Sequence, residues 1–249
     1  MKTINDIIHP SWFPMMETLL NQPKLQKLNT EILPNISFQP KKEDIFNVFS
    51  MPMKDIKLVI LGQDPYPTPG DAIGYAFLKP KDKRTPKSLQ IISKEILSSD
   101  FKNCTHVLDL DNEHTFVVPD KWTEQGVFLL NTALTVETSR AGSHLEYWKN
   151  FTASLISHIS IYHSCIWMFW GKKAQWFEPC IQKNPFHVKG YDTETIEDIP
   201  IDDDYNYVLT APHPAAEAYA GGKAGFYGCN HFYFVNKILE KQGKSTIMW

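Results

Sequence analysis

The sequence has few cysteines, no long apolar run and little excess of charge of either sign. Its 4 cysteines are widely spaced and form no CxxC pair, which argues against a zinc site and against a disulfide framework. No run approaches the roughly 18 apolar residues of a membrane span. The first residues reach Asp6 without opening an apolar stretch, so we expect no signal peptide, no membrane association and a cytoplasmic protein.

The charge is unevenly distributed along the chain. The net charge of −3 argues weakly against a general electrostatic attraction to nucleic acid. Residues 191–204 contain seven acids and no Lys or Arg, which leaves 25 basic and 21 acidic side chains elsewhere. We therefore expect an acidic, solvated loop insertion at about 190–205 on a mildly basic body.

Short apolar runs alternate with helical patterns. With 249 residues and 43% hydrophobic side chains the chain can bury a sizeable core, and its 12 glycines and 17 prolines exclude collagen-like and low-complexity classes. Runs at 56–61, 126–130, 165–170 and 207–210 are typical of buried strands, and 86–97, 147–162 and 173–181 of helices that pack one face on a sheet. This alternation predicts an α/β protein, a three-layer α/β/α fold around a mainly parallel four-stranded sheet.

Polar residues follow each predicted strand. They are Gln63 and Asp64 after the first strand, Asn131 after the second, Gly171 and Lys172 after the third, and His213 after the fourth. Each alone is more often a turn or cap residue than a catalyst. Because ligands of parallel sheets bind outside the carboxyl ends of the strands, we expect a carboxylate, an amide and an imidazole to meet along one edge.

The motifs at these positions resemble those of the family 1 uracil-DNA glycosylases. Residues 61–67 read Leu-Gly-Gln-Asp-Pro-Tyr-Pro, like the water-activating loop of that family, and further matches follow in the family's order at 126–136, 143–144, 170–175, 213–214, 225–232 and 243–249. The resemblance extends from about Phe46 to the end. It implies a single domain over 1–249 with a helical region at about 1–50.

The resemblance implies hydrolysis of the N-glycosidic bond of deoxyuridine in DNA, as in base excision repair, with uracil as product and no metal or cofactor. Asp64 matches the family's acid, whose carboxylate stabilises the cationic sugar and orients water. His213 matches the imidazole that donates a hydrogen bond to a uracil oxygen, which a neutral histidine can do. A turn-forming Asp and an ordinary loop His are the simpler alternatives.

Four further residues match the family's uracil-binding groups. Asn131 matches the amide that pairs with the uracil edge, and cytosine would leave that pairing unsatisfied at about 1–3 kcal/mol per group. Tyr66 matches the ring that blocks a 5-methyl group, Phe77 matches the ring on which the base stacks, and the backbone near Gln63 matches a further donor. Core packing is the simpler alternative for Phe77.

The sequence departs from the family pattern where DNA would bind. Pro67 replaces a histidine, and Lys172 replaces a serine. The family's Pro-Ser-Pro-Leu after the catalytic histidine is Pro-Ala-Ala-Glu here, so Ala215 replaces a phosphate-binding serine and Glu217 takes the position of the leucine that inserts into the base stack as a wedge.

Two consequences of the missing wedge stay open. In the first, flipping of the nucleotide out of a duplex loses assistance, and single-stranded DNA becomes the preferred substrate. In the second, the longer loop between Tyr219 and Gly225 supplies another wedge, for which Tyr219 is the candidate. We favour the second. We also expect Lys87, Ser88, Lys172, Lys173 and Lys223 to contact the DNA backbone, although solvated surface is the simpler reading for any one lysine.

The resemblance implies single- and double-stranded uracil-containing DNA and DNA-mimicking protein inhibitors as partners of a monomer. Two other functions remain: a catalytically silent relative that binds DNA or a protein, and a glycosylase of wider base tolerance. The joint presence of the catalytic and uracil-binding residue types argues against the first, and Tyr66 argues against thymine as a substrate.

Overall fold

The structure is a computed structural model of residues 1–249, of which it describes all but 1–3, 100–106, 110–114, 118–120 and 189–195. Its centre is a five-stranded sheet in which every neighbouring pair is parallel. The spatial order is β5-β2-β7-β9-β8. The strands are β2 (Leu58–Gly62), β5 (Val127–Asn131), β7 (Ile166–Trp170), β8 (Pro185–His187) and β9 (Asn206–Ala211).

The predicted α/β class and the four predicted strands are confirmed, but the strand count of four is wrong. The fifth strand, β8, has three residues and lies at the edge of the sheet, where it pairs with β9. It begins with Pro185 and its residues are partly or fully exposed, so it carries no apolar run by which a buried strand is recognised.

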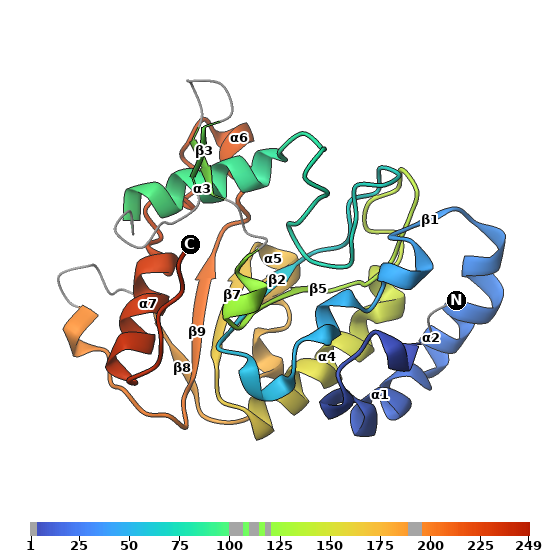
Figure 1. Ribbon diagram of the computed structural model, residues 1–249, viewed down its shortest axis with the longest axis horizontal. Coiled ribbons are helices and arrows are strands. Elements are labelled where there is room, and N and C mark those ends of the chain that lie inside the picture. Colours follow the sequence, from blue (N-terminus) through green and yellow to red (C-terminus); the bar gives the residue numbers. More distant parts are fainter. Residues whose placement is uncertain (1–3, 100–106, 110–114, 118–120, 189–195) are drawn as a thin grey trace.

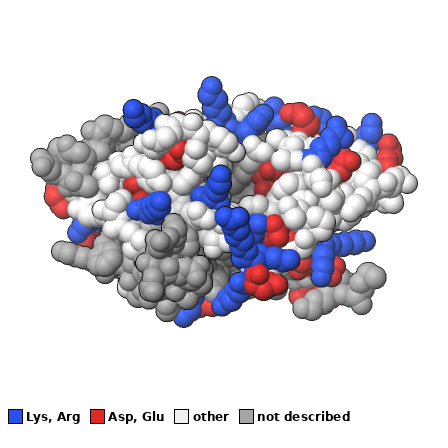
Figure 2. Space-filling view, turned by 90° about the horizontal axis from the view of Figure 1, so that it is seen from above, with Lys and Arg blue, Asp and Glu red and all other residues white. Residues whose placement is uncertain are grey.

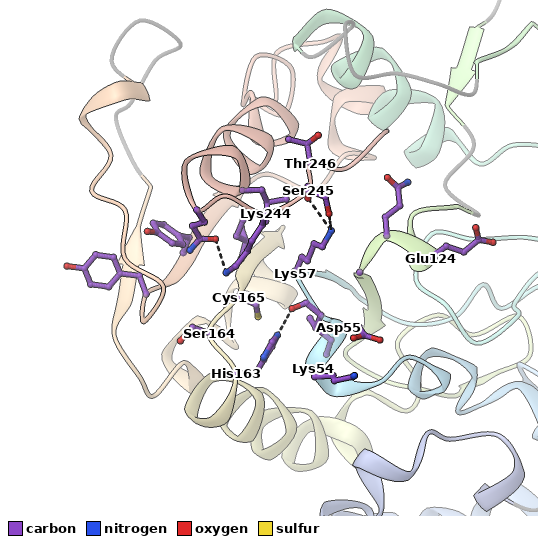
Figure 3. Close-up of a pocket in the computed structure, with 18 residues that line it drawn as sticks. Lys54, Asp55, Lys57, Glu124, His163, Ser164, Cys165, Lys244, Ser245 and Thr246 are labelled. Atoms are coloured by element: carbon purple, nitrogen blue, oxygen red, sulfur yellow. Dashed lines mark hydrogen bonds between the residues drawn. The ribbon is translucent and has the colours of Figure 1, made fainter.

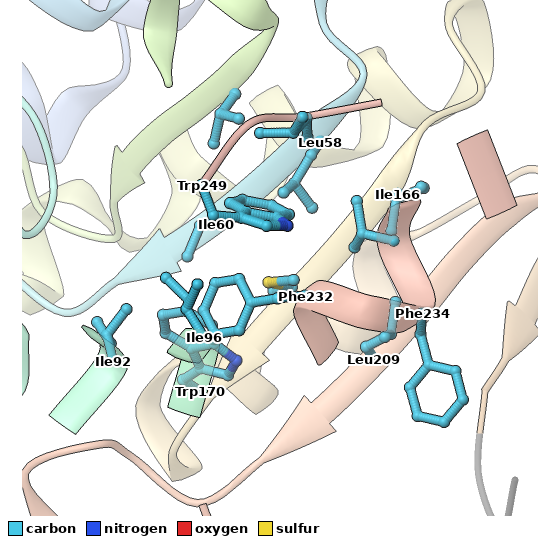
Figure 4. Close-up of a cluster of buried hydrophobic side chains, with 14 of the residues drawn as sticks. Leu58, Ile60, Ile92, Ile96, Ile166, Trp170, Leu209, Phe232, Phe234 and Trp249 are labelled. Carbon is cyan, nitrogen blue, oxygen red and sulfur yellow. The ribbon is translucent and has the colours of Figure 1, made fainter. Parts of the chain in front are cut away.

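Helices cover both faces of the sheet and make the three layers (Figure 1). On one face α3 (Lys87–Ser99) and α7 (His231–Lys241) pack on alternate strand residues such as Leu58 and Ile60 (Figure 4). On the other face α1 (Phe13–Leu20), α2 (Pro23–Lys27) and α4 (Leu145–Tyr162) pack on the intervening residues, such as Val59 and Leu61. Burial on both faces explains why these strands read as continuous apolar runs rather than as alternating ones.

Smaller elements complete the fold. Two short antiparallel pairs lie outside the central sheet, β1 (Phe38–Gln39) with β6 (Val136–Glu137) and β3 (Val107–Asp109) with β4 (Thr115–Val117). The helices α5 (Lys172–Gln175) and α6 (Ala216–Ala220) follow β7 and β9. The described residues also form the short helices η1 (Ile4–Asp6), η2 (Pro10–Trp12), η3 (Leu28–Ile32), η4 (Leu33–Asn35), η5 (Lys42–Asp44), η6 (Asn47–Ser50), η7 (Met53–Asp55), η10 (Thr123–Gln125), η11 (Glu178–Cys180) and η12 (Ile196–Asp198). Within the described ranges, none of the helices has the length and apolarity to cross a bilayer.

The predicted acidic loop at about 190–205 lies partly outside the described residues, and its described acids are exposed. Residues 189–195 lie outside the described residues, but Ile196 and Ile199 after them are each only 3% exposed and belong to the core under α7. The acids beside them meet lysines: Glu197 lies 2.8 Å from Lys241, and Asp204 lies 2.8 Å from Lys183. The described part is therefore fixed to the body by apolar contacts, with exposed ion pairs around them.

The order of the strands places a crevice at the carboxyl end of β2. The crossover from β2 to β5 carries α3 on one face, and the crossover from β5 to β7 carries α4 on the other. Loops that leave β2 and its neighbours therefore diverge, which is where open α/β sheets bind ligands.

Candidate active site

The predicted site residues gather at the carboxyl edge of the sheet. Gly62 and Asn131 are paired residues at the ends of the neighbouring strands β2 and β5. Phe77 lies in the loop after β2. Its ring is 6.5 Å from the ring of His213, which follows β9, and 5.5 Å from the ring of Trp170 at the end of β7. Four loops from distant parts of the sequence thus supply one cluster.

Asn131 is held against Gly62 and is only 6% exposed. A Cβ atom built on Gly62 would lie 2.5 Å from the Asn131 Oδ1 atom, 2.8 Å from the Ala76 Cβ atom and 3.5 Å from the Phe77 ring. The absence of a side chain at position 62 therefore makes the space in which the Asn131 amide and the Phe77 ring lie together.

Gly62→Ala tests this close approach. We expect the alanine methyl group to displace the Asn131 amide, and the uracil excision that the resemblance implies to fall about tenfold or more, since one unsatisfied buried group costs about 1–3 kcal/mol. The measurement is kcat/KM on uracil-containing DNA beside a thermal melt. Gly70→Ala is the matched control: its Cβ would meet nothing within 4 Å, but its φ of 76° makes alanine strained, so stability should fall while excision persists. Unchanged excision by Gly62→Ala would contradict the prediction.

The Asp64 carboxylate accepts two hydrogen bonds. One comes from the Gln63 side chain at 3.0 Å, and the other from the backbone N–H of Gly142, in the loop after β6. Burial raises the pKa of Asp64 above its ordinary value of 3.8, although both hydrogen bonds oppose the rise. Asp64 is consequently a fixed, partly desolvated carboxylate, as stabilisation of a nearby positive charge requires.

Among the described residues, His213 makes a hydrogen bond through only one of its two ring nitrogens. The backbone N–H of Ala215 donates to its Nδ1 atom at 3.1 Å, so the neutral ring carries its proton on Nε2. Burial lowers the pKa of His213 below its ordinary value of 6.5 and keeps the ring neutral at neutral pH. Gly171 backs the ring, because a Cβ there would lie 2.8 Å from the His213 Cβ atom. The site therefore contains a neutral imidazole with an N–H to donate.

Tyr66 is fixed on several sides. Its hydroxyl donates to the Phe77 carbonyl at 3.2 Å and is hydrogen-bonded by the Ser88 side chain, and the Lys79 Nζ atom lies 4.6 Å from the centre of its ring. Burial, opposed by the Ser88 hydrogen bond, raises the pKa of Tyr66 to about 12. Lys79 itself pairs with Asp71 at 2.5 Å. The ring is a rigid, neutral wall of the site.

Phe77 has a strained backbone. Its φ of 65° lies in the left-handed region, which costs a residue with a side chain roughly 1–2 kcal/mol. The hydrogen bond from Ala76 N–H to the Leu129 carbonyl at 3.0 Å ties this loop to β5. The fold thus supports an unfavourable conformation that turns the Phe77 ring toward Asn131 and His213.

Of the predicted DNA-backbone residues, Ser88 contacts the cluster through its hydrogen bond to Tyr66, and the lysines lie on exposed surface. Lys87 is exposed and Ser88 half-buried at the start of α3, Lys172 and Lys173 are exposed in α5, and Lys223 is exposed in the loop after α6. The possible wedge, Tyr219, is 88% exposed. Figure 2, which looks onto this edge from above Figure 1, shows Lys and Arg dispersed over the face rather than gathered into one patch.

Sequence reasoning missed the supports behind the site residues. Gly142 of the Ser143-His144 motif region bonds Asp64, Lys79 and Asp71 fix Tyr66, and the buried Glu95 and Glu217 bond the loop that follows His213. A glycine directly before a matched motif was the only signal for the first. The others depend on burial, which only the assembled fold reveals.

A separate cavity of about 600 Å³ opens at the amino ends of the strands (Figure 3). Two of its lysines have partners in the chain: Lys57 donates to the Ser245 carbonyl at 3.1 Å, and Lys244 lies 3.4 Å from Asp203. Since it lies at the opposite edge from Asp64 and His213, we do not include it in the site.

Comparison with known proteins agrees with this geometry. Residues 50–240 match the model of the uracil DNA glycosylase superfamily. The chain is 39% identical over 216 residues to the uracil-DNA glycosylase of Buchnera aphidicola, covering 84% of this chain and 83% of the relative. It is 36% identical over 245 residues to that of Aliarcobacter butzleri, covering 96% and 100%.

Solved structures show the same fold. The crystal structure of mimivirus uracil-DNA glycosylase has a TM-score of 0.75 at 24% identity and covers 98% of this chain and 87% of that one. A variant of mimivirus UNG in complex with UGI has a TM-score of 0.76 at 24% identity, with 98% and 89% coverage. The family match over most of the chain and the relatives above 30% identity show that this chain belongs to the uracil DNA glycosylase superfamily.

Proposed function

We propose that the protein hydrolyses the N-glycosidic bond of deoxyuridine in DNA, releases uracil and leaves an abasic site for base excision repair. The convergence of Asp64, Asn131 and His213 at one sheet edge around the Phe77 ring carries the proposal. Membership of the superfamily supports it.

The reaction needs stabilisation of two opposite charges. As the bond to uracil lengthens, positive charge develops on the deoxyribose and negative charge on the base. The Asp64 carboxylate would face the sugar, stabilise the cation and orient the water that attacks it. Its two donors, Gln63 and Gly142, hold it in one orientation, so little reorganisation is needed during the reaction.

His213 would stabilise the departing base. Its Nε2–H can donate to a uracil oxygen, and this bond strengthens as negative charge accumulates there. A neutral ring suits this role because the oxyanion needs a donor rather than a proton, as with other neutral imidazole electrophiles.

Base recognition would come from the groups around Gly62. The Asn131 amide pairs with the N3–H and O4 of uracil, and the Phe77 ring stacks on the base. Tyr66 occupies the space beside C5 and rejects the methyl group of thymine. The Gln63 peptide supplies a further donor. The Gln63 carbonyl accepts from the Ala133 N–H at 3.1 Å and from the Thr132 hydroxyl at 2.6 Å, which fixes that peptide.

The target nucleotide must leave the base stack to enter such a site. We propose that Tyr219 is the wedge that fills the space left in the base stack by the flipped nucleotide. We also propose that Lys87, Ser88, Lys172 and Lys223 contact the DNA phosphates. The exposure of Tyr219 in α6, six residues after His213, supports its role. DNA-mimicking inhibitors would bind the same surface, a proposal supported by the complex of the mimivirus relative with UGI. We further propose that the protein acts as a monomer in the cytoplasm.

Tyr219→Ala tests the wedge. Since stacking on a base contributes about 1–3 kcal/mol, we expect excision from duplex DNA to fall about tenfold, with a smaller loss on single strands, where no partner base must be replaced. Tyr162→Ala, at a site 72% exposed on α4, is the matched control and should leave the excision rate on both substrates unchanged. Equal losses on the two substrates would contradict the wedge role.

The proposed activity itself is tested with oligonucleotides that carry one uracil, cytosine or thymine, in single- and double-stranded form. We expect release of uracil alone from both forms. Binding of uracil-containing DNA without release would instead favour the silent relative, and release of thymine or cytosine a glycosylase of wider tolerance.

A further inference from the structure

Glu217 is a buried carboxylate enclosed by the loop that follows it. It lies in α6, four residues after His213, and is 3% exposed. Its Oε2 atom accepts from the Ala224 N–H at 3.0 Å, and its Oε1 atom accepts from the N–H groups of Phe226 and Tyr227, the latter at 3.1 Å. Carboxylates are rarely buried unless their oxygens are satisfied, and here the donors are all backbone groups of one loop.

The backbone of the loop is shaped around this contact. The Glu217 carbonyl accepts from Gly222 N–H at 3.1 Å, and Gly221, Gly222 and Gly225 have φ values of 59°, 79° and 91°. Burial raises the pKa of Glu217, but the backbone donors outweigh burial and hold it below its ordinary value of 4.5, which favours the ionised form. Each of these bonds is therefore charge-assisted.

A second buried carboxylate holds the far end of the same loop. Glu95 of α3 is fully buried and accepts from Gly228 N–H at 2.7 Å and from Asn230 N–H at 2.9 Å. The stretch between His213 and α7 is thus bonded to carboxylates in its middle and at its end. The large side chains that it exposes are Tyr219, Lys223 and Tyr227.

We propose that Glu217 is a positioning residue that sets the conformation of residues 219–227 before DNA arrives. At this position the resemblance implies a leucine wedge, whereas the side chain here points into the loop. Preorganisation lowers the conformational entropy lost on binding, so Glu217 acts on DNA affinity through Tyr219 and Lys223. The proposal rests on the proposed function, since it takes this loop to be the DNA-facing one.

The experiment uses the full-length protein and the variants Glu217→Gln and Glu217→Asp. Glutamine keeps the shape but sets an NH2 group against backbone donors, whereas aspartate keeps the charge on a shorter stem. The first readout is trypsin cleavage after Lys223, identified by mass. Because the Ala224 N–H in that peptide bond is hydrogen-bonded to Glu217, we expect cleavage about tenfold faster in Glu217→Gln and an intermediate rate in Glu217→Asp.

The second readout separates positioning from general damage. With Asp64 and His213 untouched, KM for uracil-containing duplex DNA should rise about tenfold in Glu217→Gln while kcat changes less than twofold. The matched control is Glu146→Gln, whose side chain is 74% exposed on α4 and which should match wild type in both readouts. A loss of folded protein alone would lower kcat rather than raise KM.

Failure of this proposal differs from failure of the proposed function. If both variants show wild-type cleavage after Lys223 and wild-type KM, Glu217 does not position the loop. If wild type releases no uracil, the function is wrong, and the trypsin rates still decide the role of Glu217. Should Glu217→Gln fail to fold, Glu217→Asp decides it: a wild-type rate overturns the proposal.

Discussion

Asp64→Asn is expected to lower uracil excision about 10²- to 10⁴-fold, the range assigned to a positioned acid–base group, with DNA binding retained. The amide has no charge with which to stabilise the sugar cation, but its oxygen can still accept from Gly142 or Gln63. Single-turnover rates of uracil release and a DNA-binding titration measure the two effects. The matched control is Asp55→Asn, exposed in η7 before the amino end of β2, which should leave the rate unchanged.

The same substitution should not destabilise the protein at neutral pH. The folded-state pKa of Asp64 is raised by burial, so the folded state binds more protons than the unfolded state and stability falls as pH rises through that pKa. Removal of the charge abolishes this cost, and we expect a melting temperature at pH 7 equal to or above that of wild type. A marked fall would indicate a structural rather than a catalytic carboxylate.

The raised pKa of Asp64 also sets the acid limit of activity. Excision requires the ionised form, so the rate should fall as pH decreases through the raised pKa, at a higher pH than an exposed aspartate with its ordinary value of 3.8 would give. Burial lowers the pKa of His213 from 6.5, so protonation of the imidazole should cause no loss of activity near neutral pH.

His213→Gln is expected to lower kcat about 10²- to 10³-fold, the cost of one donor to a developing oxyanion. The glutamine amide has a donor, but it lacks the Nδ1 acceptor by which Ala215 N–H fixes the imidazole. KM should change little, because the bond strengthens mainly in the transition state. His187→Gln, on the exposed edge strand β8, is the matched control. A rise in KM with unchanged kcat would mean that His213 only binds the substrate.

The sequence predicted the elements that have a local pattern of apolar residues, but not those that depend on contacts between distant residues. The four central strands were predicted because burial on both faces leaves continuous apolar runs, and α4 because Phe151, Leu155 and Ile159 recur on one side. The edge strand β8 was missed, since three partly exposed residues owe their conformation to pairing with β9. Local pattern thus predicted the core layers but not the edge.

The site divides in the same way. Asp64, Asn131 and His213 were found because each follows a strand and matches a motif, and the structure places them at one edge. The contact between Asp64 and Gly142 was not predictable, since the whole of α3 and β5 lies between them in the sequence and they meet only when β2 and β5 pair. For Glu217, sequence reasoning recognised that an acid cannot act as a wedge, but not that backbone donors from its own loop surround it.

The position of β2 between β5 and β7 determines when a newly made chain can become active. Its partners lie far along the chain on its C-terminal side, and the loop with His213 comes after all the strands. Such non-local pairing forms slowly, and the ribosome synthesises the partner strands and the His213 loop only after β2. A nascent or truncated chain therefore carries Asp64 without the imidazole that completes the site, so an unfinished protein has no means of cutting bases from the genome.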